Sequence, residues 1–314
     1  MITTFDRGGL SPPAEGSVLS VGVFDGVHLG HRAILEANVG AARSLGSVPM
    51  VVTFRSHPKL LLLGRAPRTL TTLEHRLELF ARAGIGHTVV LEFDESLREL
   101  SAEGFVEEIG VRSLGVRRFV LGFDSKFGHH RQGTPEFLAS LGFDVEVVPK
   151  VVVRGRPVSS TAIREAVELG DLEGACAMLG RAVTVFGRVV PGAHRGREIG
   201  FPTANLDLHH ELHPPTGVYA CRARILEGRF ADRVLAGVTN IGFRPTVEAR
   251  TSSAPHVEVH LFDFQGDLYG VNVELEFVQR LRGERRFDGI EALADQIRTD
   301  VATARTILAG PRSC

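Results

Sequence analysis

The sequence predicts an α/β domain with a parallel sheet, followed by a small antiparallel β domain that ends in a helix. In the first half, short apolar runs alternate with amphipathic segments, which is typical of a doubly wound parallel sheet. From Arg181 onward, period-2 runs follow one another across Gly, Pro and Asn turns, which indicates a small antiparallel barrel or sandwich. A length of 314 residues is enough for two domains that each bury a core.

The first half contains five predicted strands, at 17–24, 48–54, 87–93, 117–123 and 144–153. Between them, apolar residues recur at near-helical spacing and predict helices over 34–45, 73–80 and 105–114. Thr134 and Pro135 have the pattern of an N-cap followed by proline at the first helical position. A helical region over 159–180 closes this half, and we place the domain boundary so that the domains are 1–182 and 183–314.

The second half contains period-2 runs at 183–190, 217–225, 234–241, 256–264 and 271–278. The chain then ends in one predicted helix. Its start has a capping-box pattern in Asp288 and Glu291. Its apolar stripe consists of Ile290, Leu293, Ile297, Val301 and Ala304.

Charge and composition narrow the range of partners. Lys and Arg number 36 against 37 for Asp and Glu, so the formal net charge of −1 gives no support for a nucleic-acid or membrane partner recognised by bulk charge. Cys176, Cys221 and Cys314 form no CxxC pair and no metal spacing, which indicates structural thiols in a reducing compartment. The N-terminus lacks a secretory pattern, and no apolar run approaches the roughly 20 residues that span a bilayer. We therefore expect a cytoplasmic globular protein.

Three unusual stretches come directly after predicted strands: GVFDGVHLGH at 22–31, TFRSHP at 53–58 and GFDSKFG at 122–128. Ligands of open α/β sheets bind beyond the carboxyl ends of the strands. The three stretches therefore predict a single crevice at that edge of the sheet.

The stretch GVFDGVHLGH predicts a phosphate site. Its glycines let a ligand approach the backbone, and the N-terminus of the helix that follows favours anions. His28 and His31 are three residues apart, so they face the same way on the first turn and suit the oxygens of a triphosphate. The pattern is neither GxGxxG nor a Walker A motif, which disfavours a dinucleotide dehydrogenase and a P-loop kinase. Taken alone, the stretch also fits a glycine turn with two incidental histidines.

A second candidate phosphate site is SSTAIR at 159–164. The hydroxyls of Ser159, Ser160 and Thr161 begin a helix, and Arg164 follows one turn later on the same edge. Hydroxyls, free backbone N–H groups and a guanidinium together bind phosphate strongly. Taken alone, the same pattern fits a plain capped helix with a surface arginine.

The segment GRVVPGAHRGREIGFPTANL at 187–206 predicts a phosphate loop and a metal pair in the second domain. Gly192, Gly196 and Gly200 allow a mobile loop to close over phosphates. Thr203 and Asn205 are two residues apart, so both project to one side of an extended chain, and their hard oxygen atoms suit Mg²⁺. The alternative is a glycine-rich hairpin with an ordinary Pro-Thr turn.

Several other polar residues leave more than one interpretation open. In HVEVHLFDF, Glu258 lies on the polar face of a strand, but Glu274 and Glu276 show the same pattern, and periodicity does not choose among them. His129 and His130 fit an ATP contact or a turn equally well. The group His209, His210 and His213 favours a surface loop over a metal site, because it is not HExxH and ends in prolines.

Taken in order, GVFDGVHLGHR, VTFRSHP, GFDSKFGHHRQG and SSTAIR resemble the adenylyltransferase module of bacterial bifunctional FAD synthetases, over about the first 180 residues. The resemblance implies a Rossmann-like nucleotidyltransferase domain that transfers AMP from ATP to FMN. It implies catalytic roles for His28, His31 and Arg164, and flavin contacts from His57, Asp124 and Phe127. It also implies ATP contacts from Gly22, Phe24, Asp25, Gly26, Gly30, Ser159, Ser160 and Thr161.

The motifs of this first module depart from the family pattern on the acceptor side. Arg55 and Ser56 stand where the family has Glu and Pro in TFEPHP. Phe123 and Ser125 flank Asp124 where the family has an acid and an aromatic residue. These departures raise the alternative of an impaired or acceptor-altered adenylyltransferase.

The stretches GREIGFPTAN, GVYACRARI, GVTNIGFRPT, VEVHLFDFQGDLYG and LRGERRF resemble the riboflavin kinase module of the same family, over roughly 183–305. The resemblance implies a six-stranded barrel with Glu258 as catalytic base. It implies that Thr203 and Asn205 hold Mg²⁺ with ATP, and that Gly192, Gly196, Arg197 and Gly200 bind phosphate. It also implies that Arg282, Glu284 and Phe287 lie near the flavin.

The two resemblances together imply an enzyme that phosphorylates riboflavin to FMN and then adenylylates FMN to FAD. The expected partners are ATP with Mg²⁺, riboflavin and FMN, with no nucleic acid and no membrane, and a weak homo-oligomer is compatible with the sequence. Two alternatives remain at this point: a riboflavin kinase with a changed adenylyltransferase domain, and a flavin- or nucleotide-binding regulator without turnover.

Overall fold

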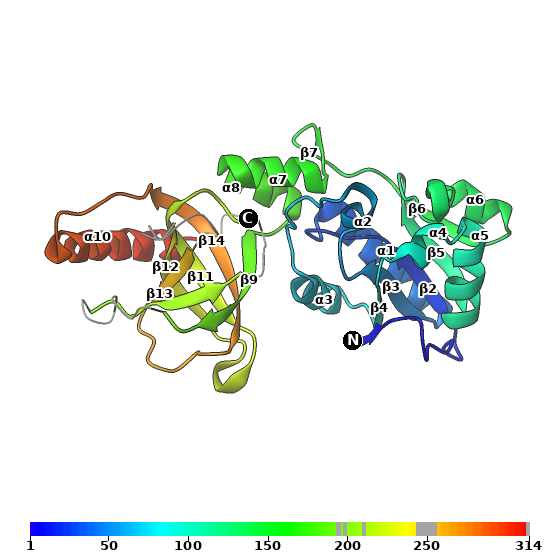
Figure 1. The fold of residues 1–314 in the computed structure, drawn as a ribbon, viewed down its shortest axis with the longest axis horizontal. Helices are drawn as coiled ribbons and strands as arrows, with labels where there is room; N and C mark the ends of the chain where they lie inside the picture. Colours follow the sequence, from blue (N-terminus) through cyan, green and yellow to red (C-terminus); the bar gives the residue numbers. More distant parts are fainter. Residues whose placement is uncertain (193–195, 197–199, 209–211, 243–255, 312–314) are drawn as a thin grey trace. The chain divides into compact units, whose positions relative to one another are not determined.

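The computed structural model describes residues 1–192, 196, 200–208, 212–242 and 256–311. The chain divides into two compact units, Met1–Ser160 and Thr161–Cys314 (Figure 1). The first unit is an α/β sheet domain and the second is built around a closed β-barrel. The predicted fold class is therefore confirmed. Of the two alternatives for the second half, a barrel or a sandwich, the structure shows the barrel.

The first unit is built on a parallel sheet of six strands in the order β1-β4-β3-β2-β5-β6. The strands are β1 (Ile2–Phe5), β2 (Ser17–Val21), β3 (Val48–Phe54), β4 (His87–Leu91), β5 (Val116–Gly122) and β6 (Asp144–Val148). Strand β1 was not predicted, because it is a four-residue edge strand with little buried surface. The strand predicted over 144–153 ends at Val148, and a small hairpin of β7 (Val152–Val153) and β8 (Arg156–Pro157) follows.

Helices cover both faces of this sheet. They are α1 (Leu29–Leu45), α2 (Lys59–Leu63), α3 (Leu73–Arg82), α4 (Glu95–Glu99), α5 (Ala102–Phe105), the π-helix η1 (Val106–Ser113), the 3₁₀ turn η2 (His129–Arg131) and α6 (Pro135–Ser140). One core joins Leu19 and Phe119 of the sheet to Ile109 of η1, and another joins Val51 to Leu35 and Phe80. The predicted cap of α6 is confirmed, because Thr134 accepts a hydrogen bond from the Phe137 N–H at 3.2 Å.

The strand order reverses beside β2, and this reversal positions the first site. β2 pairs with β3 on one side and with β5 on the other, all in parallel. The carboxyl ends of these three strands therefore lie side by side, at a topological switch point where such sheets bind ligands. The stretches 22–31, 53–58 and 122–128 follow those three ends, so the structure brings them to one edge as predicted.

The second unit is a closed antiparallel barrel with the strand order β10-β13-β12-β11-β14-β9. Its strands are β9 (Val183–Val190), β10 (Ala204–Asp207), β11 (Gly217–Ile225), β12 (Val234–Gly242), β13 (His256–Leu261) and β14 (Asn272–Arg282), with the short turn η3 (Gly228–Phe230) between β11 and β12. Val257 and Val259 of β13 are buried, while Glu258 between them is half-exposed, as the period-2 pattern predicts. Among the barrel strands that the structure describes, β10 alone was not predicted, because it has four residues.

Two helices precede the barrel. The region predicted as helical over 159–180 divides into α7 (Ser160–Leu169) and α8 (Leu172–Leu179), because Gly170 between them has φ of +78°. Asp171 caps α8 by accepting the Gly174 N–H at 2.8 Å. Helix α8 packs on β9 and β14 and buries Ala175, Cys176, Met178 and Leu179. The domain boundary after residue 182 stays a prediction.

The last helix, α10 (Ile290–Ala309), packs against β11, β12 and β14 (Figure 1). Its N-cap is Gly289, which makes no side-chain hydrogen bond, so the predicted capping box of Asp288 and Glu291 is wrong. Arg305 donates to both carboxylate oxygens of Asp263 at 2.9 Å, and these hydrogen bonds lower the pKa of Asp263. This ion pair attaches the helix to the segment that follows β13.

The described cysteines differ from each other. Cys221 is free and fully buried in β11, and its burial raises the pKa of its thiol. Cys176 is disulfide-bonded, so the expectation of structural thiols throughout does not hold for this residue. Among the described helices, none is long and apolar enough to cross a membrane.

Candidate active sites

The loop between β2 and α1 has a constrained backbone. Phe24 and Val27 have positive φ angles of 51° and 38°, and Gly26 between them has φ of +83°. Non-glycine residues in this region cost about 1–3 kcal/mol each and persist where the surroundings impose the conformation. Such strain at the switch point of the sheet is typical of a functional loop.

The two histidines of this loop form a stacked pair. The rings of His28 and His31 lie 3.6 Å apart between centroids, with an interplanar angle of 14°. His28 is the N-cap of α1, and its Nδ1 accepts the His31 N–H at 3.2 Å. Because Nδ1 is the acceptor, a neutral His28 ring carries its proton on Nε2. A Cβ on Gly30 would lie 3.2 Å from the His28 ring, so glycine at this position leaves the pair its space.

Phe24 and Asp25, both predicted to contact ATP, are buried in the structure. The Phe24 ring meets His31 edge-on at 5.2 Å and also packs on Phe80 at 5.5 Å. The Asp25 Oδ1 accepts the N–H of Leu70 at 2.9 Å and the N–H of Thr71 at 3.2 Å. The Gly26 N–H donates to Thr71 Oγ1 at 3.0 Å. These contacts indicate that Phe24 and Asp25 fix the conformation of the loop between β2 and α1 from its buried side.

Arg76 of α3 is a buried cation that the sequence analysis missed. Its Nη1 donates to Val23 O at 2.6 Å and to Thr53 Oγ1 at 3.2 Å, and its Nη2 donates to Phe54 O at 3.0 Å. Buried arginines need such partners, since an unpaired charge is costly inside a protein. Arg76 therefore ties the chain after β2 to the end of β3. Its position in an ordinary amphipathic helix gives no signal in the sequence.

The SSTAIR stretch begins at the same loop. Ser160 Oγ donates to the Asp25 carbonyl oxygen at 2.9 Å, so the hydroxyl run starts beside the histidine motif. The compact α/β unit ends at Ser160, whereas Thr161 and Arg164 lie in α7 beyond that division. The phosphate contacts of Ser159, Thr161 and Arg164 stay predictions.

The predicted flavin residues of the first unit separate into exposed and buried ones. His57 Nδ1 accepts the Lys59 N–H at 3.1 Å and so shapes the turn after β3. Asp124 is exposed after β5, whereas Phe127 is in the core and packs on Phe105 at 5.1 Å. Phe123, a departure from the family pattern, is 50% exposed, with Lys150 Nζ 6.0 Å from its ring centroid. The accessible aromatic surface at the end of β5 is therefore that of Phe123.

In the barrel, three polar side chains form a row across neighbouring strands. Asn205 of β10 lies opposite Glu258 of β13, and Glu258 lies opposite Asn240 of β12. Directly opposed residues of antiparallel strands share one face of the sheet. Glu258 also lies 3.5 Å from His256 Nε2. Glu274 and Glu276, which share its sequence pattern, instead lie 3.9 Å from Arg224 and 3.1 Å from Arg222.

The predicted metal residues fit a hard cation. The Asn205 side chain is buried, and its Oδ1 has no hydrogen-bond partner among the described residues. Thr203, two residues earlier, contributes a hydroxyl on the same extended segment. His260 Nδ1 lies 2.8 Å from Pro202 O, which fastens this segment to β13. An orphaned amide oxygen next to a hydroxyl suits Mg²⁺, which prefers hard oxygen ligands and keeps several waters.

Two of the predicted loop glycines approach these residues closely. A Cβ on Gly192 would overlap the Asn205 amide, and a Cβ on Gly196 would overlap the Phe201 carbonyl and lie 3.3 Å from Thr203 Oγ1. Gly200 has φ of +83°, a conformation that favours glycine. Arg197, His209 and His210 lie outside the described residues. His213 is buried, with Nδ1 2.7 Å from Pro214 O.

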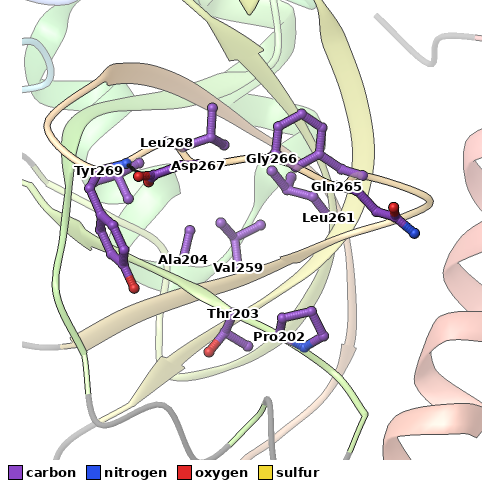
Figure 2. A pocket seen from close by; sticks show the side chains of 12 residues that line it. Pro202, Thr203, Ala204, Val259, Leu261, Gln265, Gly266, Asp267, Leu268 and Tyr269 are labelled. Atoms are coloured by element: carbon purple, nitrogen blue, oxygen red, sulfur yellow. Dashed lines mark hydrogen bonds between the residues drawn. The ribbon is translucent and has the colours of Figure 1, made fainter.

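A pocket of about 530 Å³ opens beside Thr203 (Figure 2). Pro202 and Thr203 lie on one side of it and residues 265–268 on the other, with Val259 and Ala204 between them (Figure 2). The aromatic residues Phe264 and Tyr269 are part of the lining. This size, with an apolar wall and few polar groups, suits a ligand as large as a nucleoside.

The predicted flavin loop of the barrel follows β14. Arg282 donates to the carboxylate of Asp300 on α10, at 2.9 to 3.1 Å. The guanidinium carbon atoms of Arg282 and Arg285 lie 5.6 and 4.7 Å from the Phe287 ring centroid. A Cβ on Gly242 would overlap the Glu284 carboxylate, so Glu284 lies against the end of β12. Arg282 and Phe287 thus come together, while Glu284 lies at the end of β12. Asp300, which holds Arg282, was not predicted from the sequence.

A stacked histidine pair at the switch point of the parallel sheet, and a closed barrel in which Asn205 lies opposite the carboxylate Glu258, are compatible with a two-unit enzyme that transfers phosphate groups. The FAD synthetase family model matches residues 11–162, and the riboflavin kinase family model matches residues 179–308. The chain belongs to the bifunctional riboflavin kinase/FMN adenylyltransferase family. The resemblance stated from the motifs is therefore confirmed.

Relatives with this name align along nearly the whole chain. The bifunctional riboflavin kinase/FMN adenylyltransferase of Haemophilus influenzae is 38% identical and covers 93% of this chain and 94% of its own length. That of Escherichia coli K12 is 37% identical, with 93% of each chain covered. A crystal structure from Streptococcus pneumoniae, described as a macrolide-efflux protein, has 30% identity and a TM-score of 0.83, covering 97% of this chain and 99% of that one. It shows the same fold.

Proposed function

We propose that the barrel unit phosphorylates riboflavin to FMN and that the α/β unit adenylylates FMN to FAD, each with ATP. The observation that carries the proposal is that each unit has a phosphate-type site with different chemistry. The barrel site contains a half-exposed carboxylate, Glu258, opposite the buried Asn205. The α/β site contains the stacked imidazoles at a helix N-terminus, and the carboxylate of the same loop, Asp25, is engaged with Leu70 and Thr71.

In the barrel, Glu258 acts as general base on the 5′-hydroxyl of riboflavin. A hydroxyl has a pKa far above neutrality, so it needs a base to become a good nucleophile. As the proton passes to Glu258, the hydroxyl oxygen bonds to the γ-phosphorus of ATP, and the bond from that phosphorus to the leaving ADP oxygen breaks. Thr203 and Asn205 would hold Mg²⁺, which would supply positive charge for the transferring group.

The pocket beside Thr203 would hold the adenosine of this ATP. Tyr269 and Phe264 offer aromatic surface for the adenine ring, and Thr203 lies at the pocket and two residues before Asn205. A triphosphate that starts in the pocket can therefore extend toward the row of Asn205 and Glu258. Gly192 lies against Asn205 and Gly196 lies close to Thr203, so both glycines leave space beside the residues proposed to hold Mg²⁺.

In the α/β unit, a phosphate oxygen of FMN attacks the α-phosphorus of a second ATP, and the bond to pyrophosphate breaks. This phosphate has a second pKa of about 6, so it is mostly dianionic at neutral pH and needs no base. The N–H groups at the start of α1 and the Nε2–H of His28 donate hydrogen bonds to the charge that develops on the phosphate oxygens. His31 would act beside it, and Arg164 would contact the phosphates through its guanidinium.

The direct test is product analysis with the purified full chain, riboflavin, ATP and Mg²⁺. We expect FMN with one ADP, then FAD with one pyrophosphate, separated by chromatography. FMN without FAD, even when FMN is supplied, would support the altered-acceptor alternative that Phe123 and Ser125 raise. If neither riboflavin nor ATP is consumed, the whole proposal is overturned. We place both reactions in the cytoplasm, where ATP is available.

A further inference from the structure

Asp300 is a buried carboxylate on the barrel-facing side of the C-terminal helix. It lies among the half-buried apolar residues of α10, and its side chain is only 7% exposed. Removing a carboxylate from water is costly unless it is paired and hydrogen-bonded. A buried aspartate at this position therefore needs a specific partner. Formation of the helix does not by itself explain the presence of a carboxylate here.

The partner of Asp300 is the end of β14. Arg282 Nε donates to both carboxylate oxygens at 3.1 and 3.0 Å, and Arg282 Nη2 donates to Oδ2 at 2.9 Å. Gln296 Nε2, one turn earlier on α10, donates to Oδ1 at 2.7 Å. Such charge-assisted fork contacts fix both distance and orientation. The last residue of β14 is therefore held in one geometry by the helix.

The same network extends to the loop 283–288. Arg285 of this loop donates to Gln296 Oε1. Phe287 lies under the guanidinium groups of Arg282 and Arg285. Through Arg282 and Gln296, Asp300 therefore connects to the start of the loop and to Arg285 in its middle.

The loop in turn reaches the row that contains the proposed base. Glu284 lies against Gly242, two residues beyond Asn240, and Asn240 is opposite Glu258. A displacement of the loop would therefore move Glu284 and Phe287 relative to Glu258.

We propose that Asp300 is a positioning residue of the kinase site: its carboxylate orders the loop 283–288 before riboflavin binds. This inference rests on the proposed riboflavin kinase function. When the loop is already ordered, riboflavin binding does not carry the entropic cost of immobilising the loop. Loss of the Asp300 carboxylate is therefore expected to weaken riboflavin binding. The ATP pocket beside Thr203 is lined by other segments, so the KM for ATP is independent of Asp300.

The test uses full-length Asp300→Asn, which keeps the size of the side chain but removes its charge. The expected result is a rise of about tenfold in the KM for riboflavin, with kcat and the KM for ATP within twofold, since ordering costs of this size attach to a few side chains. Riboflavin fluorescence quenching measures the same loss of affinity without turnover. Asp300→Glu, which restores the charge, is expected to recover part of it. The exposed Asp295, paired with Arg298 on the same helix, provides the control Asp295→Asn, which is expected to match wild type.

Adenylylation of added FMN by the same preparations shows whether the chain remains competent elsewhere. If Asp300→Asn does not fold, Gln296→Ala removes the link to Arg285 without leaving a buried charge unpaired, and it is expected to raise the riboflavin KM about threefold. A riboflavin KM unchanged in the folded variants, or equal rises in the KM for riboflavin and ATP, would overturn the role of Asp300. A wild-type chain that does not phosphorylate riboflavin would instead overturn the proposed function itself.

Discussion

Asn205 of β10 and Glu258 of β13 lie directly opposite each other on one face of the barrel. Opposed side chains of antiparallel strands have Cβ atoms about 4.5–5.5 Å apart. The amide oxygen proposed to hold Mg²⁺ and the carboxylate proposed to take a proton therefore lie within the span of one reacting phosphate and hydroxyl. This register places both groups of the kinase chemistry on rigid strands.

The first prediction concerns Glu258. Glu258→Gln keeps the shape of the side chain but cannot accept the hydroxyl proton, so the kinase kcat is expected to fall by about 10²–10⁴. Adenylylation of added FMN is expected to remain at the wild-type rate. Both rates are measured on the full chain by chromatography of the flavins.

The matched control for this variant is Glu276→Gln, because Glu276 shares the strand pattern of Glu258 but pairs with Arg222. Its kinase kcat is expected to stay within about twofold of wild type, since it lies outside the row of Asn205 and Glu258. Kinase turnover retained in Glu258→Gln, or lost equally in both variants, would contradict the assignment of the base.

The second prediction concerns Gly192, where a Cβ would overlap the Asn205 amide. Gly192→Ala forces either the loop or Asn205 to move, so it is expected to raise the Mg²⁺ concentration needed for half-maximal kinase activity by about tenfold or more, as a displaced metal ligand does. Titration with Mg²⁺ at saturating ATP measures this change.

The control for Gly192 is Gly40→Ala in α1, where a Cβ would meet nothing within 4 Å. This variant is expected to leave the Mg²⁺ dependence of the kinase unchanged. If both glycine variants give the same Mg²⁺ titration curve, the close approach of Gly192 to Asn205 does not affect Mg²⁺ binding.

The third prediction separates the two roles of His28. His28→Asn retains a side chain that can cap α1, so the unfolding midpoint is expected to stay close to that of wild type. It loses the imidazole Nε2–H, so adenylylation of FMN is expected to fall by about 10²–10³, the effect of removing one donor to a developing oxyanion. Kinase activity is expected to be unchanged.

Two further variants serve as comparisons for His28→Asn. His28→Ala also removes the cap, which costs about 0.5–2 kcal/mol of stability, so it is expected to lose both adenylylation and stability. His31→Ala is expected to lose adenylylation with riboflavin phosphorylation intact. If His28→Asn adenylylates FMN as fast as wild type, the imidazole has no part in the transfer.

Much of the fold was predictable, because hydrophobic periodicity and turn residues are local features of the sequence. The runs at 48–54 and 217–225 became β3 and β11 with the same bounds, since both are apolar or alternating segments between turn residues. The capping box at Asp288 failed because Gly289 took the cap position. The four-residue strands β1 and β10 were too short to show a period.

The site was predictable only where residues carry a motif. His28 and His31 come together as the spacing predicts, because both lie on one helical turn. Asp25 and Phe127 belong to matching motifs, but the structure buries both, a distinction that only tertiary packing makes. Arg76 and Asp300 support the two sites from helices with ordinary amphipathic patterns, so their partners become visible only when distant segments meet.

The last prediction tests where the second unit begins. The sequence places the boundary after residue 182, whereas the compact second unit begins at Thr161 and includes α8, which packs on β9 and β14. A fragment of residues 183–314 would lose the buried side chains of Met178 and Leu179, each contributing about 1.5–3 kcal/mol. That loss is a large part of the usual 5–15 kcal/mol of domain stability, so the fragment 161–314 is expected to unfold at clearly higher urea concentration. Both fragments, where folded, are expected to phosphorylate riboflavin, because Thr203, Asn205 and Glu258 are present in each. Equal urea midpoints would show that α8 adds nothing to the barrel and would favour the boundary after residue 182.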